Sequence, residues 1–316
     1  MGRIIITGSN GQLGQCLYNE YLRQNYVVEL SNIIDEKSRY ELKNTYMFLG
    51  HNEFDITDEK SIKETFEEFK PDIVINCAAY TNSNKAEEPS EWKKVYSVNM
   101  DGVSNLAKCC NHCGVFLIHI STDYVFDGKK RTPYTEDDKP NPLNTYGKSK
   151  LLGEMGISDA MHQKNYLIFR TSWLYSEYGN NFLTKMIKKI DSNENTQVVC
   201  DMIGSPTYAM DLAKFLIEIC ENRLYEGKCG IYNFSNLGST TWYDLAKRIE
   251  LYRNGRDTHL ISPCLCDTYE TKAEKPCYSV LSMEKTLRDF SEIIILNWDE
   301  SLRVCVEKIP IDKEWH

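Results

Sequence analysis

The sequence has no excess of positive charge and no long apolar run. Its 37 Lys and Arg residues are outnumbered by 46 Asp and Glu residues, which gives a formal net charge of −9. Nucleic acids and anionic membranes attract proteins through an excess of positive charge, so this balance argues against both as partners. The longest apolar runs, such as 115–118, fall far short of the ~20 residues that span a bilayer. We expect no nucleic-acid partner and no membrane association.

No signal peptide is recognisable at the start of the sequence. Residues 1–3 lead directly into the apolar run 4–6 and a glycine loop, so no charged and apolar regions precede a cleavage site. We therefore expect a cytoplasmic location. In that reducing compartment the 12 cysteines should remain thiols.

A zinc-finger pattern is also missing. Cys109, Cys110, His112 and Cys113 form the tightest cluster of metal-binding residue types, but no second pair follows at zinc-finger spacing. The cluster falls late in a helical segment, where cysteine packs as a small apolar side chain. We expect no metal.

Short apolar runs alternate with longer segments of helical period, which predicts an α/β fold with a parallel sheet wrapped by helices. At about 150 residues per domain, the length predicts about two domains. We expect at least five or six strands in the sheet. The strands are expected at 3–7, 72–77, 115–120, 166–170 and 196–200, and the helices at 12–24, 90–112 and 146–155. Later elements are expected at 209–221 and 242–252 (helices) and 231–234 (strand).

The second strand and the start of the helix before Pro71 cannot be assigned from the hydrophobic period alone. The second strand is either 26–30 or 46–49, and the sequence leaves both open. Thr57 is the expected N-cap of a helix, with acidic residues in its first turn and Pro71 ending it.

A glycine loop lies between the first strand and the first helix. Gly8, Gly11 and Gly14 form a G-x-x-G-x-x-G pattern, which lets a pyrophosphate approach the backbone at a helix N-terminus. A tight turn without a ligand is the alternative. In such folds Asp55-Ile56 and Ala78-Ala79 lie where adenine and ribose are bound.

The end of the expected second strand lacks the acidic residue that would bind a ribose 2′-hydroxyl. Gly50, His51 and Asn52 stand there instead. Without a carboxylate, a 2′-phosphate meets no repulsion. This favours NADPH as the cofactor, with NADH accepted as well.

Tyr146 and Lys150 are four residues apart and share one helix face. An ammonium beside the phenol is expected to lower the pKa of Tyr146, so that it can act as an acid. Ser121 and Thr122 end the strand that precedes this helix, where a hydroxyl can bond to the same substrate oxygen.

Together these motifs resemble the extended short-chain dehydrogenases/reductases and, within them, the dTDP-4-dehydrorhamnose reductase family. The likeness runs nearly end to end. It is carried by segments 11–14, 54–58, 76–81, 85–87, 121–128, 146–150, 170–175, 180–182, 204–207, 242–244 and 279–281.

The resemblance implies a Rossmann-type doubly wound sheet with a smaller, interleaved C-terminal substrate domain. The dinucleotide-binding domain would take residues 1–172 and about 196–230. The sugar-nucleotide domain would take about 173–195 and 231–316. The implied reaction is NAD(P)H-dependent reduction of the 4-keto group of dTDP-4-dehydro-6-deoxy-L-mannose to dTDP-L-rhamnose.

The resemblance also implies roles for individual residues. The catalytic triad would be Thr122, Tyr146 and Lys150, the last two also touching the cofactor. Asn99 would support the proton path of the lysine. Cofactor-binding residues would be Gly8, Gly11, Gln12, Leu13 and Gly14 at the pyrophosphate, Asp55 and Ile56 at adenine, and Ala78, Ala79 and Tyr80 at ribose and nicotinamide. The substrate pocket would include Ser83, Thr122, Asp123, Tyr124, Trp173 and Lys275.

Three positions depart from the family pattern. Ser83 replaces an apolar residue, Asn84 a carboxylate and Lys275 an arginine, so the identity of the sugar and the grip on the nucleotide stay open. The alternatives are another 4-ketosugar reductase, an NAD-dependent epimerase of the same fold, or a regulatory subunit like the beta subunit of methionine adenosyltransferase. The sequence also leaves open whether the chain forms a homodimer.

Overall fold

A six-stranded parallel sheet forms the centre of the protein. The computed structural model describes residues 2–34 and 42–311. The strand order is β10-β5-β4-β3-β1-β2, a doubly wound order that reverses between β1 and β3, which confirms the expected α/β class. The strands are β1 (Arg3–Thr7), β2 (Thr45–Leu49), β3 (Ile73–Asn76), β4 (Phe116–Thr122), β5 (Tyr166–Thr171) and β10 (Gly230–Phe234).

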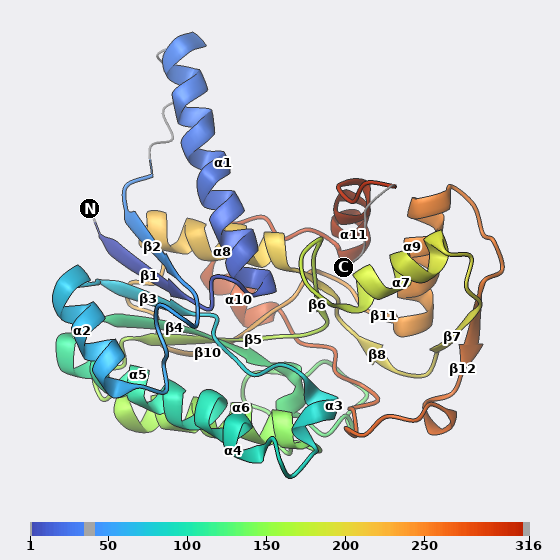
Figure 1. Ribbon diagram of the computed structural model, residues 1–316, viewed down its shortest axis with the longest axis horizontal. Helices are drawn as coiled ribbons and strands as arrows, with labels where there is room; N and C mark the ends of the chain where they lie inside the picture. Colours follow the sequence, from blue (N-terminus) through green and yellow to red (C-terminus); the bar gives the residue numbers. More distant parts are fainter. Residues whose placement is uncertain (1, 35–41, 312–316) are drawn as a thin grey trace.

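Helices cover both faces of this sheet, as the apolar strands require (Figure 1). In β1 the side chains alternate: Ile4 and Ile6 pack into one apolar core and Ile5 into the other. The first core is covered by α1 (Gln12–Ile34) and α8 (Ala209–Glu221), with α10 (Glu284–Asp289) nearby. The second is covered by α2 (Glu59–Phe69), α5 (Val103–Cys113) and α6 (Thr145–Ala160).

The structure decides between the two candidates for the second strand. Residues 46–49 belong to β2, whereas 26–30 lie inside α1, which runs ten residues past the predicted end. The run of Tyr and Val at 26–28 favours a strand by propensity alone. However, no Gly or Pro falls between residues 15 and 34 to end the helix. The strand propensity of a few residues is a weak effect, so the helix continues through them.

The predicted cap of α2 is wrong by one residue. Asp58, not Thr57, is the N-cap, because its side chain accepts a hydrogen bond from the backbone N–H of Lys60 at 2.9 Å. Thr57 instead donates its N–H and its hydroxyl to Asp55 Oδ1. The helix ends at Lys70, which has a left-handed backbone just before Pro71.

The long helix predicted at 90–112 is interrupted. It consists of α4 (Trp92–Tyr96), a π-helical turn η1 (Ser97–Gly102) and α5. A Cβ on Gly102 would lie 2.8 Å from Ile56 Cγ1, so glycine allows the turn to approach the core closely. Such π turns occur frequently at functional sites.

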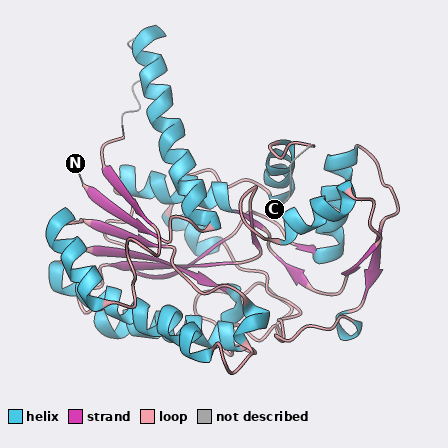
Figure 2. Ribbon diagram, viewed as in Figure 1, coloured by secondary structure: helices cyan, strands magenta, loops and turns pink. Residues whose placement is uncertain are grey.

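A smaller lobe stands beside the sheet (Figure 2). Three two-stranded pairs are separate from the large sheet: β7 with β12, β8 with β11, and β6 with β9. These strands are β6 (Leu174–Tyr175), β7 (Thr196–Val199), β8 (Ile203–Gly204), β9 (Thr207–Tyr208), β11 (Thr240–Thr241) and β12 (Ile261–Cys264). The helices of this region are α7 (Phe182–Asp191), α9 (Trp242–Asn254) and α11 (Trp298–Glu307).

Two segments lie on the opposite side from that predicted. Residues 196–200 were expected in the central sheet, but β7 pairs with β12 in the smaller lobe. Residues 231–234 were assigned to the smaller lobe, but β10 pairs with β5 at the edge of the large sheet. A short β-branched run shows that a strand forms but not which strand it pairs with. The bounds predicted for the two domains otherwise stay a prediction.

Within residues 2–34 and 42–311, no helix has both the length and the apolar character needed to cross a membrane. All twelve cysteines are free thiols.

Candidate active site

A cavity of about 580 Å³ lies at the carboxyl ends of the central strands. In doubly wound sheets ligands bind at this edge, beside the point where the strand order reverses. The lining comes from the loop after β1, the ends of β4 and β5, the start of α6 and the smaller lobe. Of the predicted site residues, it contains Gly8, Gly11, Gln12, Leu13, Gly14, Ala79, Ser83, Thr122, Asp123, Tyr124, Tyr146, Lys150 and Trp173.

The glycine loop forms one wall of the cavity and has no room for a side chain at Gly8 or Gly14. Gly8 has a φ of +64°, and a Cβ there would lie 2.7 Å from the backbone nitrogen of Ala78. A Cβ on Gly14 would lie 2.5 Å from both Gly8 O and Ser9 Cα. The first N–H groups of α1 have no carbonyl partner within the helix, and no acidic residue occupies its first turn. This wall suits a phosphate group.

The side-chain amide of Gln12 makes hydrogen bonds within the protein. Its Nε2 donates to Leu174 O at 3.1 Å, and its Oε1 accepts from Asn181 Nδ2 at 2.6 Å. Asn181 also caps α7, so this pair joins the glycine loop to the smaller lobe. A ligand at this wall would therefore meet the backbone N–H of Gln12 and not its side-chain amide.

The first turn of α6 places Tyr146 and is held from outside the helix. Asn144 caps it by accepting from Gly147 N at 2.8 Å and donates to Glu274 O at 2.7 Å. Glu87 accepts from Thr145 N at 2.6 Å. This turn is therefore fixed by segments far apart in the sequence.

Burial raises the pKa of Tyr146 to about 12, and the hydrogen bond with Thr122 opposes this rise only partly. The expected lowering of this pKa is wrong, because loss of hydration outweighs stabilisation of the phenolate. Tyr146 is thus protonated at neutral pH, which is the form that donates a proton. The ring of Tyr124 meets that of Tyr146 edge-on, with centroids 5.7 Å apart.

Lys150 is buried one helical turn further along α6. Its Nζ donates to Ile120 O at 2.6 Å and lies 3.1 Å from His119 Nε2. Burial lowers the pKa of Lys150 to about 8. His119 was not among the predicted site residues, because a lone histidine inside an apolar strand gives no sequence signal of function.

A buried carboxyl group lies next to the strand-end hydroxyl. Thr122 donates to Asp123 Oδ1 at 3.2 Å, and Oδ2 of Asp123 has no hydrogen-bond partner in the described part of the chain. Burial raises the pKa of Asp123 to about 7. The cavity therefore holds an acid that changes charge near neutral pH.

An aromatic pair closes the other side of the cavity. Trp173, between β5 and β6, stacks on Trp242 with ring centroids 3.6 Å apart and planes 11° apart. Phe182 packs against Trp242 at 4.5 Å. Trp173 has a left-handed backbone, with a φ of 46°, and a side chain on Gly204 would overlap its ring. Trp242, Phe182 and Asn181 were not among the predicted site residues, although all three lie in the segments that carry the family resemblance.

Six predicted site residues are not part of the cavity lining: Asp55, Ile56, Ala78, Tyr80, Asn99 and Lys275. Several of these have partners within the protein: Asp55 accepts from Thr57, Ile56 packs in the core, the Tyr80 hydroxyl donates to Glu91 at 2.9 Å, and Asn99 bonds to the backbone of Tyr80. Burial, and secondarily the charge of Lys185, lowers the pKa of Lys275. Roles of these six residues in binding or catalysis stay predictions.

One departure from the family pattern has a structural role. Asn84 Oδ1 accepts from the Thr271 hydroxyl at 2.7 Å and from Ala273 N at 3.2 Å. It thereby holds the segment that precedes Lys275. Ser83, in the short helix α3 (Ser83–Ala86), lines the cavity directly.

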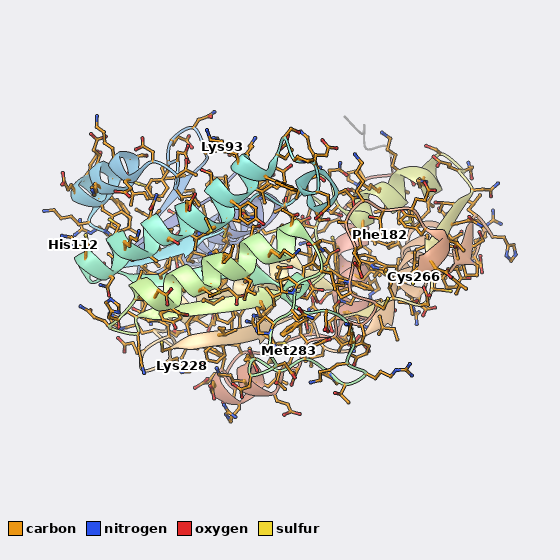
Figure 3. The ribbon with its side chains drawn as sticks, turned by 90° about the horizontal axis from the view of Figure 1, so that it is seen from below. Lys93, His112, Phe182, Lys228, Cys266 and Met283 are labelled. Carbon is orange, nitrogen blue, oxygen red and sulfur yellow. The ribbon has the colours of Figure 1, made fainter. Side chains whose placement is uncertain are left out.

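The cysteine-rich cluster is remote from this site. Figure 3 shows His112 at the end of the molecule opposite Phe182. Among the described residues, no group of three or more His, Cys, Asp or Glu side chains is arranged to hold a metal ion.

Comparison with known proteins agrees with this geometry. The profile of a family described as "RmlD substrate binding domain" matches residues 2–310. The dTDP-4-dehydrorhamnose reductase of Sinorhizobium fredii (strain NBRC 101917 / NGR234) is 35% identical over 309 residues, 95% of each chain. The dTDP-4-keto-6-deoxy-D-glucose reductase of Streptomyces niveus is 31% identical over 300 residues, also 95% of each chain.

A solved structure matches over almost the whole chain. It is the dTDP-4-dehydrorhamnose reductase from Bacillus anthracis str. Ames in complex with NADP, with a TM-score of 0.81 and 34% identity. The match covers 97% of this chain and 99% of that one. The family resemblance expected from the motifs is confirmed: the chain belongs to the dTDP-4-dehydrorhamnose reductase family.

Proposed function

We propose that the protein reduces the 4-keto group of dTDP-4-dehydro-6-deoxy-L-mannose, with NADPH as reductant, to give dTDP-L-rhamnose. One observation carries this proposal. A protonated Tyr146, the Thr122 hydroxyl, buried Lys150 and a phosphate-sized glycine cradle line a single cavity.

The glycine cradle fits a dinucleotide. Side chains at Gly8 and Gly14 would collide with backbone, so the open surface beside the first turn of α1 is built for close approach. The backbone N–H groups of Gln12 and Leu13 would hold the pyrophosphate. Asp55, Ile56, Ala78, Ala79 and Tyr80 would contact adenine, ribose and nicotinamide, as proposed from the resemblance. When bound, NADPH supplies the hydride.

Side chains of the protein would bind the ketone oxygen and protonate it. Thr122 and Tyr146 would bond to it, which orients the carbonyl and draws electron density onto the oxygen. Tyr146 would then donate its proton as negative charge develops there. Lys150 would stand behind Tyr146 and restore that proton. Asp123, Tyr124 and Trp173 would line the sugar pocket, with Ser83 and Lys275 at its margin.

A second 4-ketosugar is a candidate substrate. The relative from Streptomyces niveus is named for dTDP-4-keto-6-deoxy-D-glucose, and Ser83 places a hydroxyl on the cavity wall where the family has an apolar side chain. The two sugars differ in the ring groups that such a hydroxyl could bond.

The test is to incubate the protein with NADPH, and separately NADH, and a panel of dTDP-, GDP- and CDP-linked 4-ketosugars. Loss of nicotinamide absorbance and the product's stereochemistry are recorded. One NADPH oxidised per dTDP-L-rhamnose formed is the expected result. Product formation without net oxidation would indicate an epimerase. Tight NADPH binding without oxidation by any ketosugar would indicate a regulatory subunit. A cytoplasmic location and a homodimer stay predictions.

A further inference from the structure

Two cysteines lie side by side at the surface of the smaller lobe. The Sγ atoms of Cys266 and Cys277 are 4.0 Å apart, which is contact distance for two sulfur atoms. Cys277 is exposed, and Cys266 is half-buried in the short 3₁₀ turn η3 (Cys266–Thr268). Figure 3 shows Cys266 at the same end of the molecule as Phe182. An oxidant in solution can reach an exposed thiol, and a second thiol in contact with it can complete a disulfide.

One short stretch of backbone holds the two cysteines together. Cys266 N donates to Asp201 Oδ1 at 2.8 Å, just before β8. Ile203 N, in β8, donates to Cys277 O at 2.8 Å. Because the same stretch binds the backbone of both cysteines, their proximity follows from the fold and not only from the rotation of two surface side chains.

Closing the bond needs a small movement. The sulfur atoms of a disulfide are about 2.05 Å apart, so the two Sγ atoms must approach each other by about 2 Å. Neither cysteine lies in an α-helix, where the preceding turn would limit rotation of the side chain. A second pair of thiols in contact, Cys109 and Cys113, lies one turn apart on α5. The regular backbone of that helix leaves the second pair less freedom to form a bond, so it is an internal comparison.

We propose that Cys266 and Cys277 form a reversible disulfide on reaction with a peroxide, so that this pair is a redox modification site. Cys277 reacts first, because it is the exposed member of the pair. Its thiolate attacks one oxygen of hydrogen peroxide, the O–O bond breaks, and an S–O bond forms. The product is a sulfenic acid on Cys277. The second oxygen takes up the proton that the thiol released and leaves as water, so the sulfur is oxidised and the peroxide is reduced.

Cys266 completes the reaction. Its sulfur attacks the sulfur of the sulfenic acid, an S–S bond forms, the S–O bond breaks, and the hydroxyl leaves as water with the thiol proton of Cys266. A hydrogen bond to Asp201, together with burial and the neighbouring Cys277, raises the pKa of Cys266 to about 12. Cys266 therefore stays a thiol and does not compete for the peroxide. Its contact with Cys277 gives it a high local concentration for the second step, which offsets its small thiolate fraction.

The disulfide would close a loop over residues 267–276, and this loop reaches the candidate active site. Glu274 O accepts from Asn144 Nδ2 at 2.7 Å, in the cap that fixes the turn of Tyr146. A covalent link between its ends reduces the conformational freedom of a loop. Oxidation should therefore restrain the segment that carries Lys275. The consequence for substrate binding rests on the proposed function, in which Lys275 lies at the margin of the sugar pocket.

The decisive experiment uses the intact, reduced protein and hydrogen peroxide, with neither cofactor nor substrate. After brief oxidation the protein is unfolded, its free thiols are alkylated, and its peptides are mapped by mass spectrometry. We expect two peptides joined through Cys266 and Cys277, with the free thiols falling from twelve to ten and returning to twelve with dithiothreitol. Preferential joining of Cys109 to Cys113, or no joined peptides, would overturn the proposal even if the protein is an active reductase.

Three variants assign the two roles. Cys277→Ser should abolish the joined peptides and leave Cys266 as a thiol. Cys266→Ser should also abolish them, but here Cys277 should gain two or three oxygens as a sulfinic or sulfonic acid. Cys113→Ser removes another exposed thiol and is the matched control, which should keep the joined peptides. An unoxidised Cys277 in Cys266→Ser would contradict the order of the two steps.

Hydrogen exchange tests the effect of the bond on the loop. Amides of residues 267–276 should exchange about tenfold more slowly in the oxidised protein than in the reduced protein. Cys277→Ser treated with the same peroxide should show no such slowing. Equal exchange in the oxidised and reduced forms of the original protein would contradict the restraint of the segment that carries Lys275.

Discussion

Asn99 binds both backbone polar groups of Tyr80. Its Oδ1 accepts from Tyr80 N at 2.8 Å, and its Nδ2 donates to Tyr80 O at 3.0 Å. The same Nδ2 donates to Ser149 Oγ at 3.0 Å, and Ser149 donates to the carbonyl of Tyr146. The π-helical turn therefore ties the segment after β3 to the helix that carries Tyr146.

Asn99→Ala should destabilise the protein, because it removes the hydrogen-bond partner of two part-buried backbone groups of Tyr80. We expect a loss of about 1–3 kcal/mol in the free energy of unfolding. Urea denaturation measures it. Asn222→Ala is the matched control, since that amide donates to Glu218 in an exposed hydrogen bond and its loss should cost little. Equal effects of the two substitutions would count against the linking role of Asn99.

Gly14→Ala should weaken cofactor binding more than Gly11→Ala. A Cβ at 14 lies 2.5 Å from backbone that must move, whereas the nearest atom to a Cβ at 11 is 3.1 Å away. Displacing the loop moves the N–H groups that would hold the pyrophosphate. We expect the NADPH dissociation constant to rise by about tenfold or more for Gly14→Ala, measured by calorimetry. A larger loss for Gly11→Ala would contradict this account of the cradle.

Glu53→Gln should shift the balance between the two cofactors. No carboxylate was predicted at the end of β2, but Glu53 folds back and accepts a hydrogen bond from Gly50 N at 2.6 Å. The carboxylate therefore lies near the end of β2, where folds of this type recognise the ribose 2′ position. Removing it should raise kcat/KM for NADPH relative to NADH, by about two- to tenfold at low salt. If the ratio of kcat/KM for NADPH to that for NADH does not change, the 2′-phosphate does not bind near Glu53.

Asp123→Asn should change how stability depends on pH. The pKa of Asp123 is raised from 3.8 to about 7 in the folded protein. Because the folded state binds this proton more tightly, the group's contribution is present below about pH 4 and is lost as pH rises through 7. The variant cannot ionise, so its stability relative to the original should increase between pH 4 and 7. Urea denaturation across this range tests it, and a constant difference would refute the raised pKa.

Much of the fold could be predicted because it follows from local chemistry. The strand at 3–7, the glycine loop and the helix with Tyr146 and Lys150 are each visible within a few residues, and the structure has a strand, a loop and a helix at these places. The strand at 196–199 was also recognised, but its partner at 261–264 lies over sixty residues away, and nothing in a short apolar run specifies a partner.

The parts of the site that were missed depend on long-range contacts. His119 becomes informative only when the fold brings Asn76 and Lys150 to its two nitrogens. The raised pKa of Tyr146 likewise follows from burial, which residue spacing does not reveal. Asn181 meets Gln12 across 169 positions of sequence.

The most direct test of the central claim is the turnover of Tyr146→Phe with NADPH and dTDP-4-dehydro-6-deoxy-L-mannose. The ring and its packing against Tyr124 are kept, and only the proton donor is removed. We expect kcat to fall by about 10²-fold or more with NADPH affinity nearly unchanged. A kcat close to that of the unmodified protein would show that another group supplies the proton.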